Sequence, residues 1–72
     1  MTLEERLLQA HARDDRAALV ELYTEAANLR EAEGDIDAAC FFLTHAYIYA
    51  LELAHSATAP LKRRLSEHGR EK

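Results

Sequence analysis

The sequence predicts a single all-α domain, a small helical bundle, and three observations lead to this prediction. Alanine and leucine are the commonest residues, with 14 and 11 copies, whereas valine and isoleucine together occur three times; this balance favours helix over strand. Apolar residues recur at helical spacing and do not alternate with polar ones over the length of a strand. The chain of 72 residues has room for one domain, which we assign to residues 1–72.

A short N-terminal helix is expected to begin at a capping box. Thr2 is its N-cap and Glu5 follows three residues later, a spacing at which each side chain can bond the backbone N–H of the other residue. The helix should end near Arg13, because Asp14 and Asp15 supply the N-cap of the next helix.

The second and third helices are expected to form a central antiparallel pair, over about residues 15–33 and 35–56. Gly34 should end the second helix, since a left-handed residue costs least at glycine, and Asp35 should cap the third. So short a connection places the two helices side by side. The apolar stripe of the second helix consists of Leu19, Leu22, Ala26 and Leu29.

A fourth, weakly stable helix is expected near the C-terminus. Pro60 suits its first turn, and Leu61 and Leu65 are its only apolar pair. The cations of residues 62–64 lie in that first turn, where the helix macrodipole repels positive charge. We therefore expect residues 58–72 to form a basic, partly frayed tail.

The third helix is apolar nearly all round, and a helix of this kind is normally buried nearly all round. Its core face should consist of Ile36, Ala39, Cys40, Leu43, Ala46, Tyr47, Ala50 and Ala54. The two flanking helices bring few large side chains to cover the rest, so either the helix is wholly core or a second copy buries part of it. We predict the second copy, because large exposed apolar patches usually mark contact sites. The predicted oligomer interface consists of Phe41, His45, Ile48, Tyr49 and Glu52.

Residues from about 20 to 53 resemble a single tetratricopeptide repeat (TPR), a helix–turn–helix unit of 34 residues. The residues that carry the resemblance are Tyr23, Ala26, Ala27, Gly34, Asp35, Ala39, Leu43 and Ala46. The chain departs from the repeat at Arg30, where a tyrosine is preferred, and lacks the proline at the end of the repeat. The resemblance implies protein or peptide binding through Glu21, Thr24 and Asn28 on the first helix of the pair. A solvated helix face is the other explanation of these three polar residues.

Few side chains in the sequence are arranged in patterns typical of metal binding or catalysis. Glu52 and His55 stand three apart on the third helix, a spacing used in di-metal bundles, so a metal- or ligand-binding bundle built across a dimer is the alternative function. Cys40 falls on the core face, where a cysteine behaves as a small hydrophobe. Because phosphate-loop, serine-elbow and zinc patterns are lacking, we predict that the protein is not an enzyme and needs no cofactor and no metal.

Charge and composition restrict the partners further. The net charge of −4 disfavours nucleic-acid binding, although the cluster Lys62–Arg64 could contact an acidic partner. No signal peptide and no uncharged stretch of 18 apolar residues is visible, so we expect no membrane span and a cytoplasmic location. The sequence therefore predicts a non-enzymatic, TPR-like interaction module that forms a homo-oligomer, with a homodimer as the simplest case.

Overall fold

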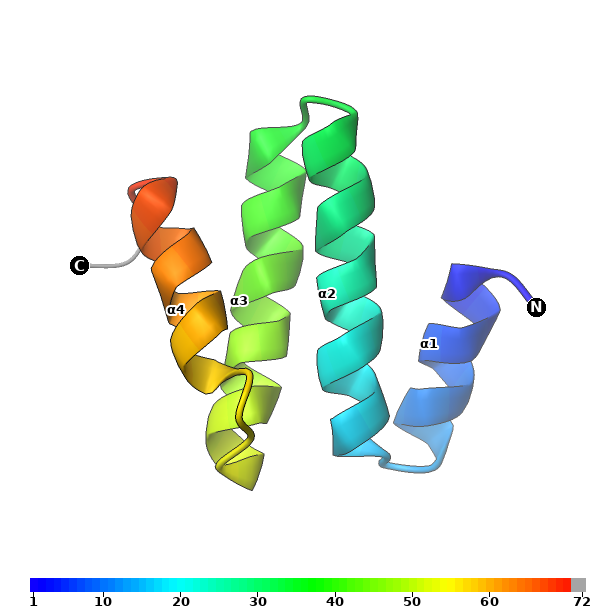
Figure 1. Ribbon diagram of the computed structural model, residues 1–72. Coiled ribbons are helices and arrows are strands. Elements are labelled where there is room, and N and C mark those ends of the chain that lie inside the picture. Colours follow the sequence, from blue (N-terminus) through cyan, green and yellow to red (C-terminus); the bar gives the residue numbers. More distant parts are fainter. Residues whose placement is uncertain (71–72) are drawn as a thin grey trace.

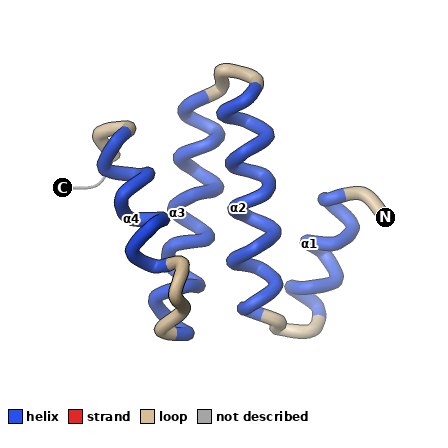
Figure 2. The backbone as a smooth tube through the Cα atoms, viewed as in Figure 1, coloured by secondary structure: helices blue, strands red, loops and turns tan. Residues whose placement is uncertain are grey.

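Helices account for most of residues 1–70, the part of the chain that the computed structural model describes. Their order is α1 (Leu3–Ala12), α2 (Arg16–Ala32), α3 (Ile36–Leu53) and α4 (Thr58–Glu67). The long helices α2 and α3 stand side by side in the centre, α1 flanks α2, and α4 flanks α3 (Figure 1; Figure 2 shows the connections). The predicted all-α class and the central helix pair with shorter terminal helices are confirmed.

The residues predicted to start the helices do so by hydrogen bonding. The Thr2 hydroxyl accepts from the backbone N–H of Glu5 at 3.1 Å, and the Glu5 carboxylate accepts in return from the N–H of Thr2 at 3.3 Å. Asp15 caps α2 and Asp35 caps α3, each through a carboxylate that accepts from the N–H three residues on. Local side-chain chemistry therefore fixes where three of the described helices begin.

The end of α3 differs from the prediction. The helix was expected to continue to about Ser56, but it ends at Leu53 because Ala54 adopts a left-handed conformation with φ of 51°. The N–H of His55 then bonds the carbonyl of Ala50 at 2.9 Å, which closes the last turn. The chain leaves the helix axis here, and this allows α4 to return along α3 (Figure 1).

Small residues bring α2 and α3 together. Ala27 on α2 and Ala39, Ala46 and Ala50 on α3 are completely buried, and Leu43 fills the space between them. Side chains of this size allow two helix backbones to approach closely, and the residues left on the outer sides then pack against α1 and α4. Of the predicted core face of α3, Ile36 and Ala54 are exposed because they lie at the two ends of the helix.

Helix α4 is joined to the core by its two leucines. Leu61 and Leu65 are both buried in the cluster that α2 and α3 form around Val20, Ala27 and Leu43. Its outer side carries exposed, hydrophilic residues: Lys62, Arg63, Ser66 and Glu67. Of the tail predicted over residues 58–72, residues 71–72 lie outside the described residues.

Candidate interaction surface

The side of α3 that faces away from α2 carries large apolar side chains that the rest of residues 1–70 leaves about half exposed. Phe41 is 59% exposed, Ile48 49% and Leu51 52%. At 100° per residue, these three and Thr44 fall within an arc of about 80° on the helix. We call Phe41, Thr44, Ile48 and Leu51 the outer stripe. The sequence-based interface lacked Thr44 and Leu51, although their spacing of three residues from Phe41 and Ile48 was visible in the sequence.

Two further predicted interface residues border the outer stripe. His45 packs against Phe41, with ring centroids 4.5 Å apart, and its Nδ1 donates to the Phe41 carbonyl at 3.0 Å. Glu52 lies one turn beyond Ile48 and forms an ion pair with Arg16 of α2, with 3.5 Å between Oε1 and Nη1. Both partners of that pair are about half exposed, so it contributes little to stability.

Tyr49, which was also predicted at the interface, lies elsewhere. Its ring stacks on Tyr23 with centroids 6.0 Å apart and meets the edge of His11 at 6.2 Å. Tyr49 is thus half-buried between α1, α2 and α3, on the flank of α3 that faces α1. This environment also raises the pKa of Tyr23, first by burial and then through the neighbouring Tyr49.

A hollow of about 380 Å³ lies at one end of the outer stripe. Four residues of α3 line it at the spacing i, i+3, i+4 and i+7: Asp37, Cys40, Phe41 and Thr44. His45 and Arg70 complete its rim, and the Arg70 guanidinium forms an ion pair with Asp37. That hydrogen-bonded pair raises the pKa of Arg70.

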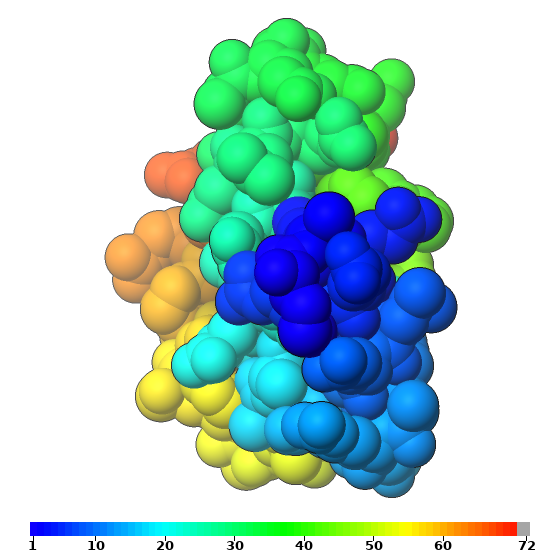
Figure 3. Space-filling view, turned by 90° about the vertical axis from the view of Figure 1, so that its right-hand side faces the viewer, coloured from blue at the N-terminus to red at the C-terminus, as the bar shows by residue number. Residues whose placement is uncertain are grey.

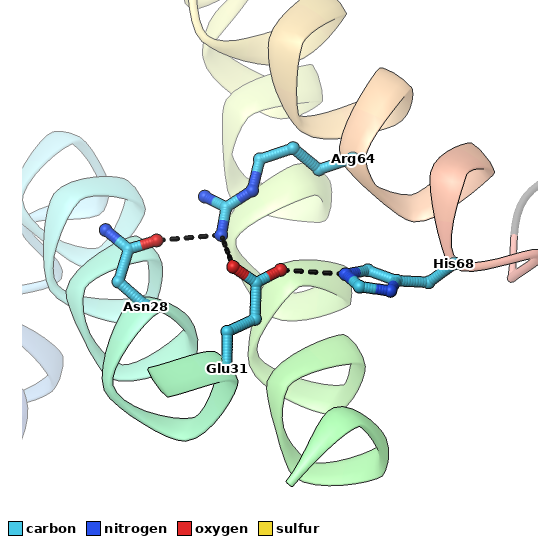
Figure 4. A network of polar contacts seen from close by, with 4 residues as sticks. All are labelled: Asn28, Glu31, Arg64 and His68. Carbon is cyan, nitrogen blue, oxygen red and sulfur yellow. Dashed lines mark hydrogen bonds and ion pairs between the residues drawn. The ribbon is translucent and has the colours of Figure 1, made fainter. Parts of the chain in front are cut away.

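The polar face predicted to bind a partner is partly engaged within the chain. Asn28 accepts a hydrogen bond from Arg64 of α4 at 2.7 Å, and Thr24 donates to the Val20 carbonyl, while Glu21 is exposed. Figure 4 shows that Arg64 also reaches Glu31, with 3.0 Å between the nearest nitrogen and oxygen. The bond to Arg64 uses one acceptor position of the Asn28 amide, so this residue has less capacity left for a partner.

Glu31 is the centre of this network, and sequence reasoning did not single it out. Its second carboxylate oxygen lies 2.7 Å from Nε2 of His68, so one side chain of α2 contacts Arg64 of α4 and His68, the residue directly after α4 (Figure 4). The hydrogen bond from His68, followed by the charge of Arg64, lowers the pKa of Glu31 below its usual value, although partial burial acts in the opposite direction.

No protein-family model, no curated protein and no solved structure matches this chain. The resemblance of residues 20–53 to a TPR therefore stays a prediction.

The structure separates the two residues of the alternative metal site. Because α3 ends at Leu53, Glu52 and His55 do not share a helical face, and Nδ1 of His55 accepts from the N–H of Ala57 at 2.9 Å. Within residues 1–70, no group of three or more histidine, cysteine or acidic side chains is placed to hold a metal ion. Cys40 is buried, as predicted.

A second candidate surface lies between α1 and the central pair. A groove of about 530 Å³ is lined mainly by apolar side chains of α1, α2 and α3, namely Leu3, Leu7, Ala26, Leu29 and Phe42. Figure 3 shows α1 (blue) covering the middle and lower part of this side and leaving the tips of α2 and α3 (green) uncovered.

Helix α3 is also long and apolar enough to cross a membrane by length and composition alone. Its 18 residues have a mean hydropathy of 1.2, and only 28% of them are buried within the chain. The expectation of no membrane span relied on charges that fall near the two ends of the helix, at Asp37 and Glu52. Core helices of soluble proteins meet the same criterion, but here much of the apolar surface faces outward.

Proposed function

We propose that this chain is a non-enzymatic, TPR-like helical interaction module that self-associates through the outer stripe of α3. One observation carries the proposal: three large apolar side chains, Phe41, Ile48 and Leu51, lie half-exposed or more on one face of the most apolar helix. Contiguous apolar surface of this kind usually marks a contact site.

A second copy is the occupant that the size of the chain favours. A domain of about 70 residues buries only about 60% of the surface that its unfolded chain exposes, so it gains much from covering more. A lone repeat-like unit also lacks the neighbours whose stacking would bury its open faces. The partner-binding face at Asn28 is a weaker candidate, because Arg64 already bonds the amide oxygen.

Sedimentation velocity over micromolar concentrations tests the proposal. We expect the wild-type chain to sediment as a dimer whose population rises with concentration, and Ile48→Glu to sediment as a monomer, because a dimer would bury two unpaired carboxylates. Leu8→Glu is the matched control: Leu8 is 65% exposed on α1, away from the stripe, and its replacement should leave the dimer unchanged. Circular dichroism verifies that both variants keep their helix content.

Two results would contradict the proposal. One is a wild-type chain that stays monomeric over the whole concentration range. The other is a monomer that floats with phospholipid vesicles and loses this binding in Ile48→Glu, which would assign the outer stripe to a lipid surface.

A further inference from the structure

We propose that two copies pair through antiparallel α3 helices, centred near Ala46, so that Leu51 of each chain enters the hollow at Asp37, Cys40, Phe41 and Thr44 of the other. This inference rests on the proposed self-association and adds its geometry. The side chain that fills the hollow is then Leu51 of the second chain, a residue that was not part of the interface predicted from the sequence.

The spacing of the outer stripe reads the same in both directions. Within α3, the positions that face outward follow at steps of three, four and three residues: 41, 44, 48 and 51. The midpoint of this series is residue 46. An antiparallel copy placed about that midpoint therefore sets Phe41 against the partner's Leu51, and Thr44 against the partner's Ile48. In each layer a larger side chain meets a smaller one, which suits close packing.

The hollow has the form that such packing requires. In helix pairs that pack by knobs into holes, one side chain inserts between four residues of the facing helix. Asp37, Cys40, Phe41 and Thr44 are four residues of this kind, and the hollow that they line together with His45 and Arg70 opens outward. In the antiparallel arrangement about residue 46, the side chain that faces Phe41, one of the residues around this hole, is the partner's Leu51, which is half-exposed in the single chain.

Shifting the antiparallel pair by one heptad loses part of the apolar contact. With the centre moved toward the start of α3, Phe41 faces Thr44 and Leu51 is left uncovered. With the centre moved toward its end, Ile48 faces Leu51 and Phe41 is left beside the segment that follows α3. Of these three registers, the one about residue 46 alone covers Phe41, Ile48 and Leu51 of both chains.

Charge distinguishes the antiparallel from the parallel pair. Parallel helices in register set Asp37 against Asp37, and their macrodipoles point the same way. The antiparallel pair sets the end of α3 that carries Asp37 and Arg70 against the end that carries Glu52 and His55. There the Arg70 guanidinium offsets the charge of Asp37 in its own chain, and the two macrodipoles run in opposite directions, which is favourable.

Cysteine cross-linking tests the geometry in the full-length chain, with Cys40→Ala as the common background. In the antiparallel pair, residue 41 lies opposite residue 51 of the partner, whereas equivalent residues 51 and 51 are separated by ten residues, or about 15 Å along the helix. A disulfide needs Cα atoms within about 7 Å. We therefore expect a mixture of Phe41→Cys and Leu51→Cys chains to give the mixed disulfide, and each variant alone to stay uncross-linked.

A second variant leaves the outer stripe intact. His45 lies to one side of the stripe, and a two-fold axis across antiparallel helices brings both copies of residue 45 to the same side, about 3 Å apart along the axis. A parallel pair places them on opposite sides. A short bifunctional thiol cross-linker should therefore join His45→Cys chains.

The outcomes separate the two proposals. Disulfides of Phe41→Cys or Leu51→Cys with themselves, or dimers in which His45→Cys is not joined, overturn the antiparallel pairing and leave self-association in place. A wild-type chain that sediments as a monomer overturns both.

Discussion

Replacing Leu65 by alanine should lower the free energy of unfolding by about 2–5 kcal/mol, the usual cost of truncating a fully buried leucine. Leu65 is 2% exposed and packs in one cluster with Val20, Ala27 and Leu43, so its removal leaves a cavity between α4 and the central pair. A chain of this length has a total stability of roughly 4–11 kcal/mol. The single substitution should therefore remove a large part of it.

Urea unfolding followed by circular dichroism measures this loss. Ser66→Ala is the matched control, because Ser66 is the exposed neighbour on the outer side of the same helix and its replacement should change the stability by less than about 0.5 kcal/mol. If Leu65→Ala and Ser66→Ala unfold at the same urea concentration, α4 is not packed on the core in solution, and the expected frayed tail is the better description of residues 58–67.

Two further substitutions test individual contacts. Ala54→Gly should raise the free energy of unfolding by about 0.5–1 kcal/mol, because Ala54 has a φ of 51° that costs a non-glycine residue energy; an unchanged or lower thermal midpoint would contradict this. Because the pKa of Glu31 is lowered, the folded state binds fewer protons at this carboxylate than the unfolded state does. The ionised Glu31 therefore stabilises the fold above the ordinary pKa of 4.5, and this stabilisation is lost as the pH falls below that value. Stability measured from pH 7 downward should therefore fall less below 4.5 in Glu31→Gln than in the wild type, and parallel profiles would show that the contacts of Glu31 with Arg64 and His68 do not matter.

Helix positions were predictable from the sequence because they depend on near neighbours. Thr2, Asp15 and Asp35 each bond a backbone N–H three residues away, so the signal for a helix start lies within one turn of the chain. The small residues of the central pair were visible for a similar reason, since they recur at helical spacing. The fold class followed from these two local patterns.

The end of α3 was not predictable in this way. Nothing near Ala54 forbids helix, and alanine is a good helix former. The left-handed turn there lets α4 return so that Leu61 and Leu65 reach the core, a contact with residues far earlier in the chain. Packing between distant segments therefore overrides a local preference at this residue.

The candidate surfaces were predictable in part. Helical spacing identified Phe41 and Ile48 as outward-facing but placed Tyr49 beside them, because periodicity alone does not say on which side α1 packs. The contact between Asn28 and Arg64 joins residues 36 positions apart, and no spacing rule connects them. For that reason the face expected to be free for a partner is partly covered by the chain itself.

The hydrophilic outer side of α4 limits how many chains can associate side by side. Another helix stacked there would have to strip water from Lys62, Arg63 and Glu67 without any apolar surface to gain in return. Addition of further chains at the outer side of α4 is therefore disfavoured. A contact that uses the same patch on both chains also leaves no copy of that patch free for a third chain. The proposed assembly through the outer stripe of α3 should therefore stop at a closed pair of chains.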